Sequence, residues 1–351
     1  MIGARHRDRY VQFTDGKIQR KHRPDYWLVL CAVLLMLVGM IIVYSVGPQY
    51  ANLQNSAYGS DYSSTYFFFK QLMGISLAVS GFILLVLVPF DYLKKYIFQL
   101  MMIGIGLSFL LFLIGNILHI DAIAQNTLGA YRWFHLGPVN FQPSELLKLA
   151  MTLYMAVFLG KRYQEGKIND LKETVYPAAA LVGFLLFIVV VLQKDMGSGV
   201  AIAAAAASIF MVSTIRMKTL MQIALVGVLF LGLTAVTAPH RLERITTFFG
   251  ASKSASQDDN DYHIKNAMIA LGTGGLTGRG IGKSIQSTGY LPEAINDSIF
   301  AVIGEIFGFA GTVLVVVLFA ALLLRVLRVA EYSPDMTRRL VVAGIFGWLF
   351  A

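Results

Sequence analysis

Residues 27–47 read WLVLCAVLLMLVGMIIVYSVG and contain no Asp, Glu, Lys or Arg. A helix crosses the hydrocarbon core of a bilayer with about 20 apolar residues. The stretch therefore predicts a membrane-spanning helix. It is longer than the apolar core of a signal peptide, and no small-residue cleavage site follows it, so we expect it to be retained as a span.

Similar apolar stretches recur along the chain. They predict spans at residues 66–89, 96–118, 144–160, 174–192, 197–215, 219–238 and 298–324, and a ninth that begins near Leu340 and stops at Ala351. Of the 351 residues, 56% are hydrophobic and 14% are charged, whereas soluble domains carry about 25% charged residues. This composition excludes a soluble enzyme and a disordered chain. We expect an all-α polytopic membrane protein.

The distribution of Lys and Arg predicts the orientation. Nineteen of the 29 lie in the tail 1–26 and in alternate loops, and eight lie in the opposite loops. Because positively charged loops stay in the cytoplasm, the N-terminus is predicted to be cytoplasmic. We expect a basic cytoplasmic tail at residues 1–25, a membrane domain at 26–351, and a large extracytoplasmic loop at 239–297. The net charge of +9 follows from this topology and from attraction to anionic lipid, not from nucleic-acid binding.

The outer segment 239–297 contains six of the eight outward cations. Either a long loop was translocated regardless of its charge, or these cations meet an anionic substrate. Within it, residues 272–284 read GTGGLTGRGIGKS. A phosphate-binding Walker A loop would need Gly in place of Thr277, so this motif is absent. The glycines form a flexible loop, or they let backbone amides approach phosphate beside Arg279 and Lys283.

Two further stretches place ionisable groups at or inside predicted spans. In YRWFHLGPVNFQPSELLKL, residues 131–149, Glu145 and Lys148 are three apart and share a helix face. They form a local ion pair at a helix start, or Lys148 faces a cavity inside the membrane. In LPEAINDSIFAVIGEIFGFAG, residues 291–311, capping of the eighth span is the default role of Asp297. Glu305 lies about two turns deeper and is a functional candidate, because carboxylates inside spans are costly.

Other chemistry is poorly supported. Asp195 in QKDMGSG, residues 193–199, is explained as a helix cap. The six histidines show no metal-ligand spacing, and the single Cys31 excludes a disulfide framework and a thiolate metal site. No nucleophilic Ser or Cys arrangement is present.

Taken together, the blocks at 132–148, 193–199, 239–249, 269–286 and 289–311 closely resemble the SEDS family, the FtsW/RodA-type peptidoglycan polymerases. The resemblance implies a ten-span helical bundle, of which this chain contains about nine spans with the last one truncated. It also implies polymerisation of lipid II outside the membrane beside a class B penicillin-binding protein. The stretches 65–71 and 282–294 look more like the division type, FtsW, than the elongation type, RodA.

The resemblance also assigns candidate residues. Asp297 falls on the essential aspartate of the family, and Asp195 falls on the aspartate of its QPD turn. The family block RW…QPSE..K corresponds here to Arg132, Gln142, Pro143, Ser144, Glu145 and Lys148. This sequence departs from the family at Lys194, at Ile295 to Asn296, at Ser298 and at Ile306, and it lacks the SYGGSS-like motif.

The implied reaction is inverting transfer of a glycan from its lipid pyrophosphate to the GlcNAc 4-hydroxyl of lipid II. Asp297 is the expected base, supported by nearby carboxylates and polar groups. Charge on the pyrophosphate is then stabilised by cations. The candidates are Arg132, Lys148, Arg279 and Lys283 for the pyrophosphate, and Gln142, Ser144, Glu145, Asp195, Glu293 and Glu305 as supporting residues. A divalent cation such as Mg²⁺ is compatible with this chemistry, although the sequence shows no ligand set for it.

Several alternatives remain open from the sequence. A transporter of lipid-linked precursors would use Glu145, Lys148 and Glu305 as a polar path, but no inverted repeat is evident. An elongation-type role and a non-catalytic division scaffold are also weighed. The expected location is the plasma membrane at the division septum, among other membrane proteins of the division complex.

Overall fold

The computed structural model describes residues 11–14, 17–20, 24–120, 123–127, 130–137, 139–236, 257–286, 289–291 and 293–351. Three of the cations expected in the outer segment, Arg241, Arg244 and Lys253, lie outside the described residues, as does the sequence block 239–249. Most of the tail 1–25 is outside them as well.

Every predicted span coincides with helix. The helices are α1 (Tyr26–Tyr58), α2 (Tyr66–Leu87), α3 (Phe90–Phe112), α4 (Pro143–Gln164), α5 (Tyr176–Leu186), α6 (Met196–Val212), α7 (Met217–Val236), α10 (Ile299–Tyr332) and α11 (Met336–Phe350). Three π-helical segments extend α3 and flank α5: η1 (Leu113–Ile117), η2 (Leu171–Val175) and η3 (Phe187–Leu192). Within the described ranges, five helices are long and apolar enough to cross a membrane by length and composition, and two shorter ones are also apolar. The expected all-α polytopic architecture is confirmed.

Local chemistry sets where these helices begin and end. Asp25 caps α1 by accepting hydrogen bonds from the backbone N–H groups of Trp27 and Leu28, which are otherwise unsatisfied at a helix start. The helix continues past the predicted end at residue 47 and stops at Gly59, whose φ is +66°. Pro143 opens α4 at a position where its missing N–H costs nothing.

Some elements were not predicted. The outer loop before α4 contains a three-stranded antiparallel sheet of β3 (Ala124–Thr127), β4 (Ala130–Leu136) and β5 (Val139–Phe141), in the order β3-β4-β5. A hairpin of β1 (Val11–Thr14) and β2 (Lys17–Arg20) lies in the tail. The helix α9 (Gln257–Gly274) lies inside the segment expected to be a loop. These strands are too short to leave a clear period-two pattern.

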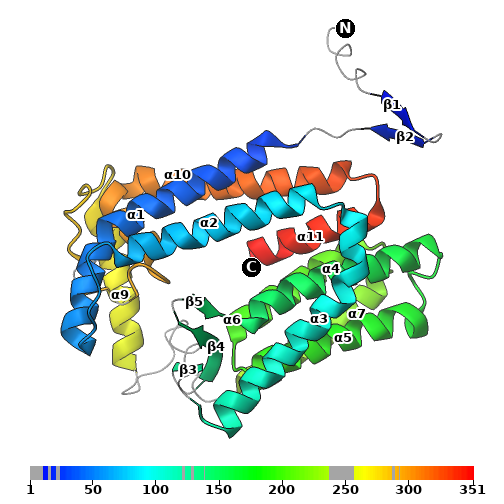
Figure 1. Ribbon diagram of the computed structural model, residues 1–351, viewed down its shortest axis with the longest axis horizontal. Helices are drawn as coiled ribbons and strands as arrows, with labels where there is room; N and C mark the ends of the chain where they lie inside the picture. The colour runs from blue at the N-terminus through cyan, green and yellow to red at the C-terminus, as the bar shows by residue number, and fades with distance from the viewer. Residues whose placement is uncertain are drawn as a thin grey trace.

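The helices pack in two groups (Figure 1). In one, α1 lies beside α2 and α10, and α9 packs on α10. In the other, α4 packs against α3, α6 and α11. Gly344 of α11 lies where an added Cβ would meet Thr152 and Ile209, so small residues let these helices approach closely. α2 has no buried residues, which suits contact with lipid.

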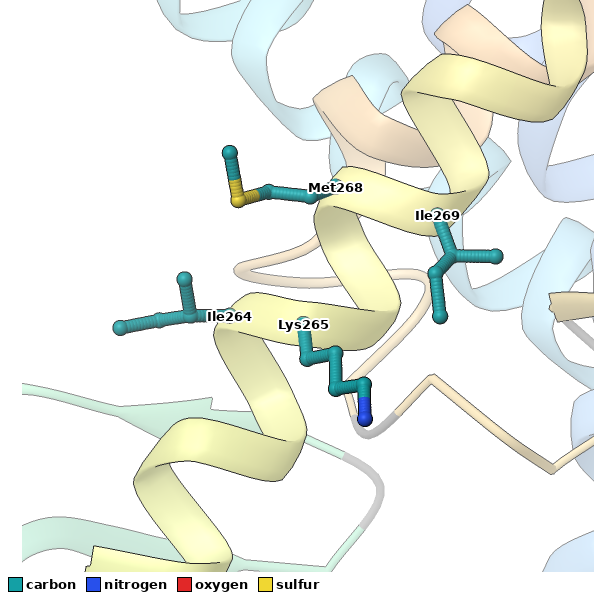
Figure 2. A pocket seen from close by; sticks show the side chains of 4 residues that line it. All are labelled: Ile264, Lys265, Met268 and Ile269. Atoms are coloured by element: carbon teal, nitrogen blue, oxygen red, sulfur yellow. The ribbon is translucent and has the colours of Figure 1, made fainter.

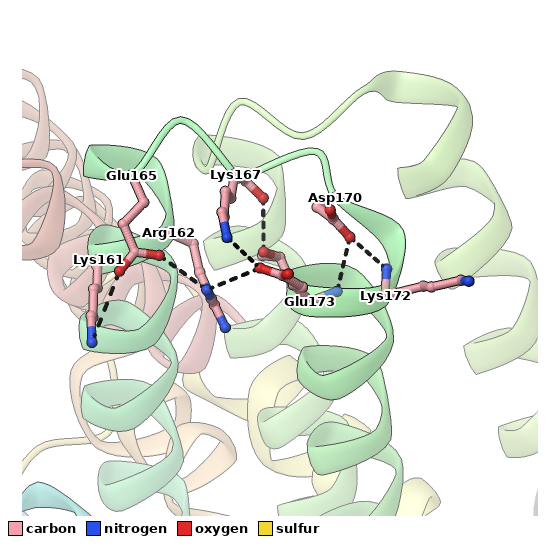
Figure 3. Close-up of polar contacts among 8 residues, drawn as sticks. Lys161, Arg162, Glu165, Lys167, Asp170, Lys172 and Glu173 are labelled. Atoms are coloured by element: carbon pink, nitrogen blue, oxygen red, sulfur yellow. Dashed lines mark hydrogen bonds and ion pairs between the residues drawn. The ribbon is translucent and has the colours of Figure 1, made fainter.

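The loops predicted to share the cytoplasmic side lie together. Arg325 at the far end of α10 is 3.8 Å from Asp25 at the start of α1. Figure 3 shows a polar network that joins the last turn of α4 to η2. Its ion pairs involve Lys161, Arg162, Glu165, Lys167 and Glu173, and Asp170 accepts backbone hydrogen bonds beside them.

Hydrogen bonds within this network shift two pKa values. The Glu173 carboxylate, 2.8 Å from the Lys167 ammonium, raises the pKa of Lys167. The backbone N–H groups of Glu173 and Lys172 lower the pKa of Asp170. Both groups are therefore charged at neutral pH, and the loop is a fixed polar cap on this end of the bundle.

Candidate functional site

A first polar cluster joins β4, the start of α4 and the turn before α6. We call it the α4–α6 cluster: Arg132, Gln142, Ser144, Glu145, Lys148, Asp195 and Ser198. The Arg132 guanidinium donates to the Lys194 carbonyl oxygen at 2.7 Å. The Gln142 amide donates to Asp195 Oδ2 at 2.7 Å, while Asp195 Oδ1 accepts from the Ser198 N–H at 3.1 Å. Asp195 caps α6, as predicted, and also ties α6 to α4.

Lys148 is the buried cation of this cluster. It is 6% exposed, and its ammonium lies 2.7 Å from Glu145 Oε1. On its other side, the ammonium is 4.9 Å from the ring centroid of Trp348 in α11. The predicted ion pair is confirmed, whereas the contribution of Trp348 was missed because nothing in the sequence links α4 to α11. The carboxylate of Glu145 is half-exposed, so this ion pair lies at the edge of the bundle core.

A second group of candidates lies at the turn before α10. Asp297 is exposed, and within the described part of the chain its side chain makes no hydrogen bond or ion pair. Ser298, not Asp297, is the N-cap residue of α10. The prediction that Asp297 caps this helix is therefore wrong. The turn is closed by backbone hydrogen bonds from Asn296 and Ser298 to the Glu293 carbonyl oxygen, which leaves the Asp297 carboxylate available to a ligand.

The glycine-rich segment packs directly on the backbone of α10. The N–H groups of Arg279 and Gly280 donate to the carbonyl oxygens of Glu305 and Ile306, at 2.9 and 3.0 Å. In return, the N–H groups of Phe309 and Ala310 donate to residues 275 and 276. The helix is interrupted at Gly308, whose φ is +66°.

This close contact between backbones explains why positions 274 and 278 are glycine. An added Cβ at Gly274 would meet the Gly304 carbonyl oxygen, and one at Gly278 would meet the Ile306 carbonyl oxygen. The interpretation of this segment as a flexible loop is therefore wrong for residues 274–280. The amides of Arg279 and Gly280 are also not available to phosphate, because α10 accepts both of them.

We expect Gly274→Ala to lower the melting temperature by several degrees, because the new methyl group overlaps backbone that cannot rotate away. Gly272→Ala in the same helix is the matched control, since nothing lies within 4 Å of its added Cβ. Alanine is favoured over glycine in a helix by about 0.5–1 kcal/mol. Thermal unfolding of both variants in detergent tests this, and equal melting temperatures would contradict the close packing.

The candidate cations are distributed over both groups. Arg279 is partly buried with Nε 3.4 Å from the Thr273 carbonyl oxygen, and Lys283 is exposed. Among the residues that the structure describes, no hydrogen bond or ion pair joins the Asp297 turn to Arg132 or Lys148. The assignment of Arg132, Lys148, Arg279 and Lys283 to the pyrophosphate therefore stays a prediction.

The described ranges contain no group of three or more His, Cys, Asp or Glu side chains that fits a metal ion. We therefore assign no reaction step to a divalent cation.

Beside the Asp297 turn, α9 is linked to the start of α10 by His263 Nε2, which lies 3.4 Å from the Ser298 hydroxyl. An open depression of about 500 Å³ lies on α9. Figure 2 shows the three apolar side chains and one cation that line it: Ile264, Lys265, Met268 and Ile269.

Comparison with known proteins shows a consistent set of similarities. The family model FTSW_RODA_SPOVE, described as "Cell cycle protein", matches residues 25–351. The chain is 30% identical over 332 residues to Stage V sporulation protein E of Bacillus subtilis, covering 94% of this chain and 85% of that protein. It is 32% identical to a probable peptidoglycan glycosyltransferase FtsW of Saccharophagus degradans, covering 94% and 81%.

Solved structures share the fold at lower identity. One, described as "Structural coordination of polymerization and crosslinking by a peptidoglycan synthase complex", aligns with a TM-score of 0.65 at 22% identity, covering 92% of this chain and 83% of that one. The rod shape determining protein RodA of Thermus thermophilus aligns with a TM-score of 0.59 at 22% identity, covering 92% and 81%.

Proposed function

The chain belongs to the FtsW/RodA/SpoVE family, and from this premise we propose that it is a peptidoglycan glycosyltransferase that polymerises lipid II. Relatives named as FtsW glycosyltransferases, matched along nearly the whole chain, support this activity and favour the division-type role over the elongation-type one. The single observation that carries the proposal is the Asp297 carboxylate directly before α10, which is exposed and has no hydrogen-bond or ion-pair partner among the described residues.

In the proposed reaction, Asp297 accepts the proton from the 4-hydroxyl of the incoming GlcNAc. The freed oxygen attacks the anomeric carbon of the donor glycan, and the bond to the lipid pyrophosphate breaks. An α-linked donor thereby gives a β-1,4 bond in one inverting step, without a covalent enzyme intermediate. A single positioned base is sufficient for such a proton transfer.

The leaving pyrophosphate requires positive charge. Lys148, held between Glu145 and Trp348, is our first candidate, because charges at buried sites interact with less screening than exposed ones. Arg132, Arg279 and Lys283 are the further candidates. Gln142, Ser144 and Asp195 hold the start of α4 against α6, and Glu145 pairs with Lys148. Glu293 closes the Asp297 turn, and Glu305 holds Ser284.

The wider assignments are proposals of the same kind. We place the multi-pass chain in the bacterial plasma membrane at the septum, with the basic tail 1–25 in the cytoplasm and the segment 239–297 outside. Its partners would be lipid II, a class B penicillin-binding protein and other membrane proteins of the division complex.

A precursor transporter is the competing function. Broken helices in transporters open a cavity near the membrane midplane. Here the break at Gly308 is filled by residues 274–280, which gives the transport hypothesis no specific support.

Purified protein with its transpeptidase partner and labelled lipid II tests the activity. We expect polymeric glycan strands, separated by gel electrophoresis. Movement of lipid II across vesicles without any polymer would instead favour the transporter.

The orientation is tested by thiol labelling in a Cys31→Ser background. We expect Ser63→Cys, in the loop after α1, to react with an impermeant reagent in spheroplasts, and Ser333→Cys, in the loop after α10, to react only after lysis. The physical reason is the excess of Lys and Arg on the Ser333 side. The reverse labelling pattern would overturn both the orientation and an outward-facing Asp297.

A further inference from the structure

Glu305 is a fully buried carboxylate inside α10, and its exposed fraction is 0%. Its oxygens accept hydrogen bonds from three consecutive residues. The Ser284 hydroxyl donates at 2.5 Å, the Ile285 N–H at 2.8 Å and the Gln286 N–H at 3.2 Å. A carboxylate that accepts several hydrogen bonds holds its partners more firmly than a neutral acceptor.

These bonds tie together the two ends of the chain segment that contains the proposed base. The chain from Ser284 to Glu305 begins and ends at the same carboxylate, and Asp297 lies between the two ends. Within the loop, the Leu291 N–H donates to the Gln286 carbonyl oxygen at 2.8 Å. Leu291 is buried among residues of α1 and α10, including Ile42.

The same residue also fixes the glycine-rich segment. The Glu305 carbonyl oxygen accepts the Arg279 N–H at 2.9 Å, while its carboxylate holds Ser284, which directly follows Lys283. Glu305 thus connects, through bonds on its backbone and its side chain, the segment that bears two candidate cations to α10, the helix that begins directly after the turn bearing Asp297.

We propose that Glu305 is a positioning residue for polymerisation: its carboxylate holds residues 284–286 and so sets the placement of Asp297 and Lys283 relative to α10. This inference rests on the proposed function. A misplacement of reacting groups by about 1 Å costs up to about 100-fold in rate, so a loosened loop would slow turnover without preventing the fold.

Glu305→Gln is the sharpest test, because it preserves size and replaces one acceptor oxygen with an amide donor. The amide nitrogen would face a backbone N–H donor, leaving one buried donor without an acceptor. Glu331→Gln, exposed near the opposite end of the same helix, is the matched control. The measurements are hydrogen exchange of residues 284–297, polymerisation kinetics against lipid II concentration, and melting temperature.

For Glu305→Gln we expect amide exchange of Ile285 and Gln286 to accelerate by about tenfold. Turnover should fall by about tenfold or more, with the KM for lipid II changed by less than about twofold. The control should match the unsubstituted protein in all three measurements. Ser284→Ala, which removes only the hydroxyl donor, should shift exchange and turnover in the same direction by a smaller factor, and serves if Glu305→Gln does not fold.

Faster amide exchange with unchanged turnover would overturn the positioning role. Unchanged exchange would show that the Glu305 carboxylate does not hold residues 284–286. If Glu305→Gln and Gly274→Ala both lose turnover in proportion to their loss of melting temperature, Glu305 has only a structural role. Because exchange is measured without substrate, its result stands apart from the activity: absence of polymerisation by the unsubstituted protein would instead reject the proposed function.

Discussion

Asp297→Asn should eliminate polymerisation of lipid II while the protein stays folded. Asparagine has the same shape as aspartate but no useful basicity, and general-base assistance is typically worth about 10²–10⁴-fold. The Asp297 side chain has no hydrogen bond or ion pair in the described part of the chain, so little stability depends on it. Glycan product and melting temperature, recorded on the same preparation, test both halves of this expectation.

Two comparisons sharpen the Asp297 experiment. Asp61→Asn changes an exposed aspartate in the loop after α1 and should retain full activity. Glu293→Gln tests the other exposed carboxylate of the same turn. A stable, active Asp297→Asn protein would end the general-base proposal, and loss of activity only in Glu293→Gln would move the base to Glu293.

Lys148→Met has the second largest expected effect, a decrease in turnover of about 10²–10³-fold, by analogy with removal of one charge-stabilising donor from an active site. Methionine occupies the buried space of the lysine side chain without its charge. The melting temperature should change little, because the carboxylate of Glu145 is half-exposed and is rehydrated when its partner is lost. Initial rates at saturating lipid II measure the effect.

Lys161→Met is the matched control on the same helix, since the Lys161 side chain is 76% exposed at the opposite end of α4. It should leave the rate unchanged. If Lys148→Met polymerises as fast as this control, the positive charge of Lys148 has no part in stabilising the pyrophosphate, and its role is to pair with Glu145.

Much of the fold was predictable because its main signals are local. Apolar stretches of about 20 residues mark spans wherever they occur, and each of them is a helix in the structure. The Glu145–Lys148 pair followed from a spacing of three on one helix face. Asp195 as a cap followed from its position directly before α6.

The wrong or missing predictions concern positions at which the local sequence is compatible with more than one structure. Asp297 and Ser298 are both good caps, and the backbone of the turn decided for Ser298. The short strands β3 to β5 were not predicted, because their register depends on Tyr131 and Phe134 packing against Leu111 of α3. The glycines of residues 274–280 looked like a flexible loop until α10 was placed against them.

The sequence by itself determined the class of the protein, its spans and the residue types available for chemistry. Apolar stretches and clusters of charge can be recognised from neighbouring residues alone. Only the tertiary structure decided which of those residues meet. Lys148 contacts Trp348 across 200 positions, Asp195 binds Gln142 across 53, and Glu305 holds Ser284 across 21. Such contacts depend on how close-packed helices approach one another, which no local pattern specifies.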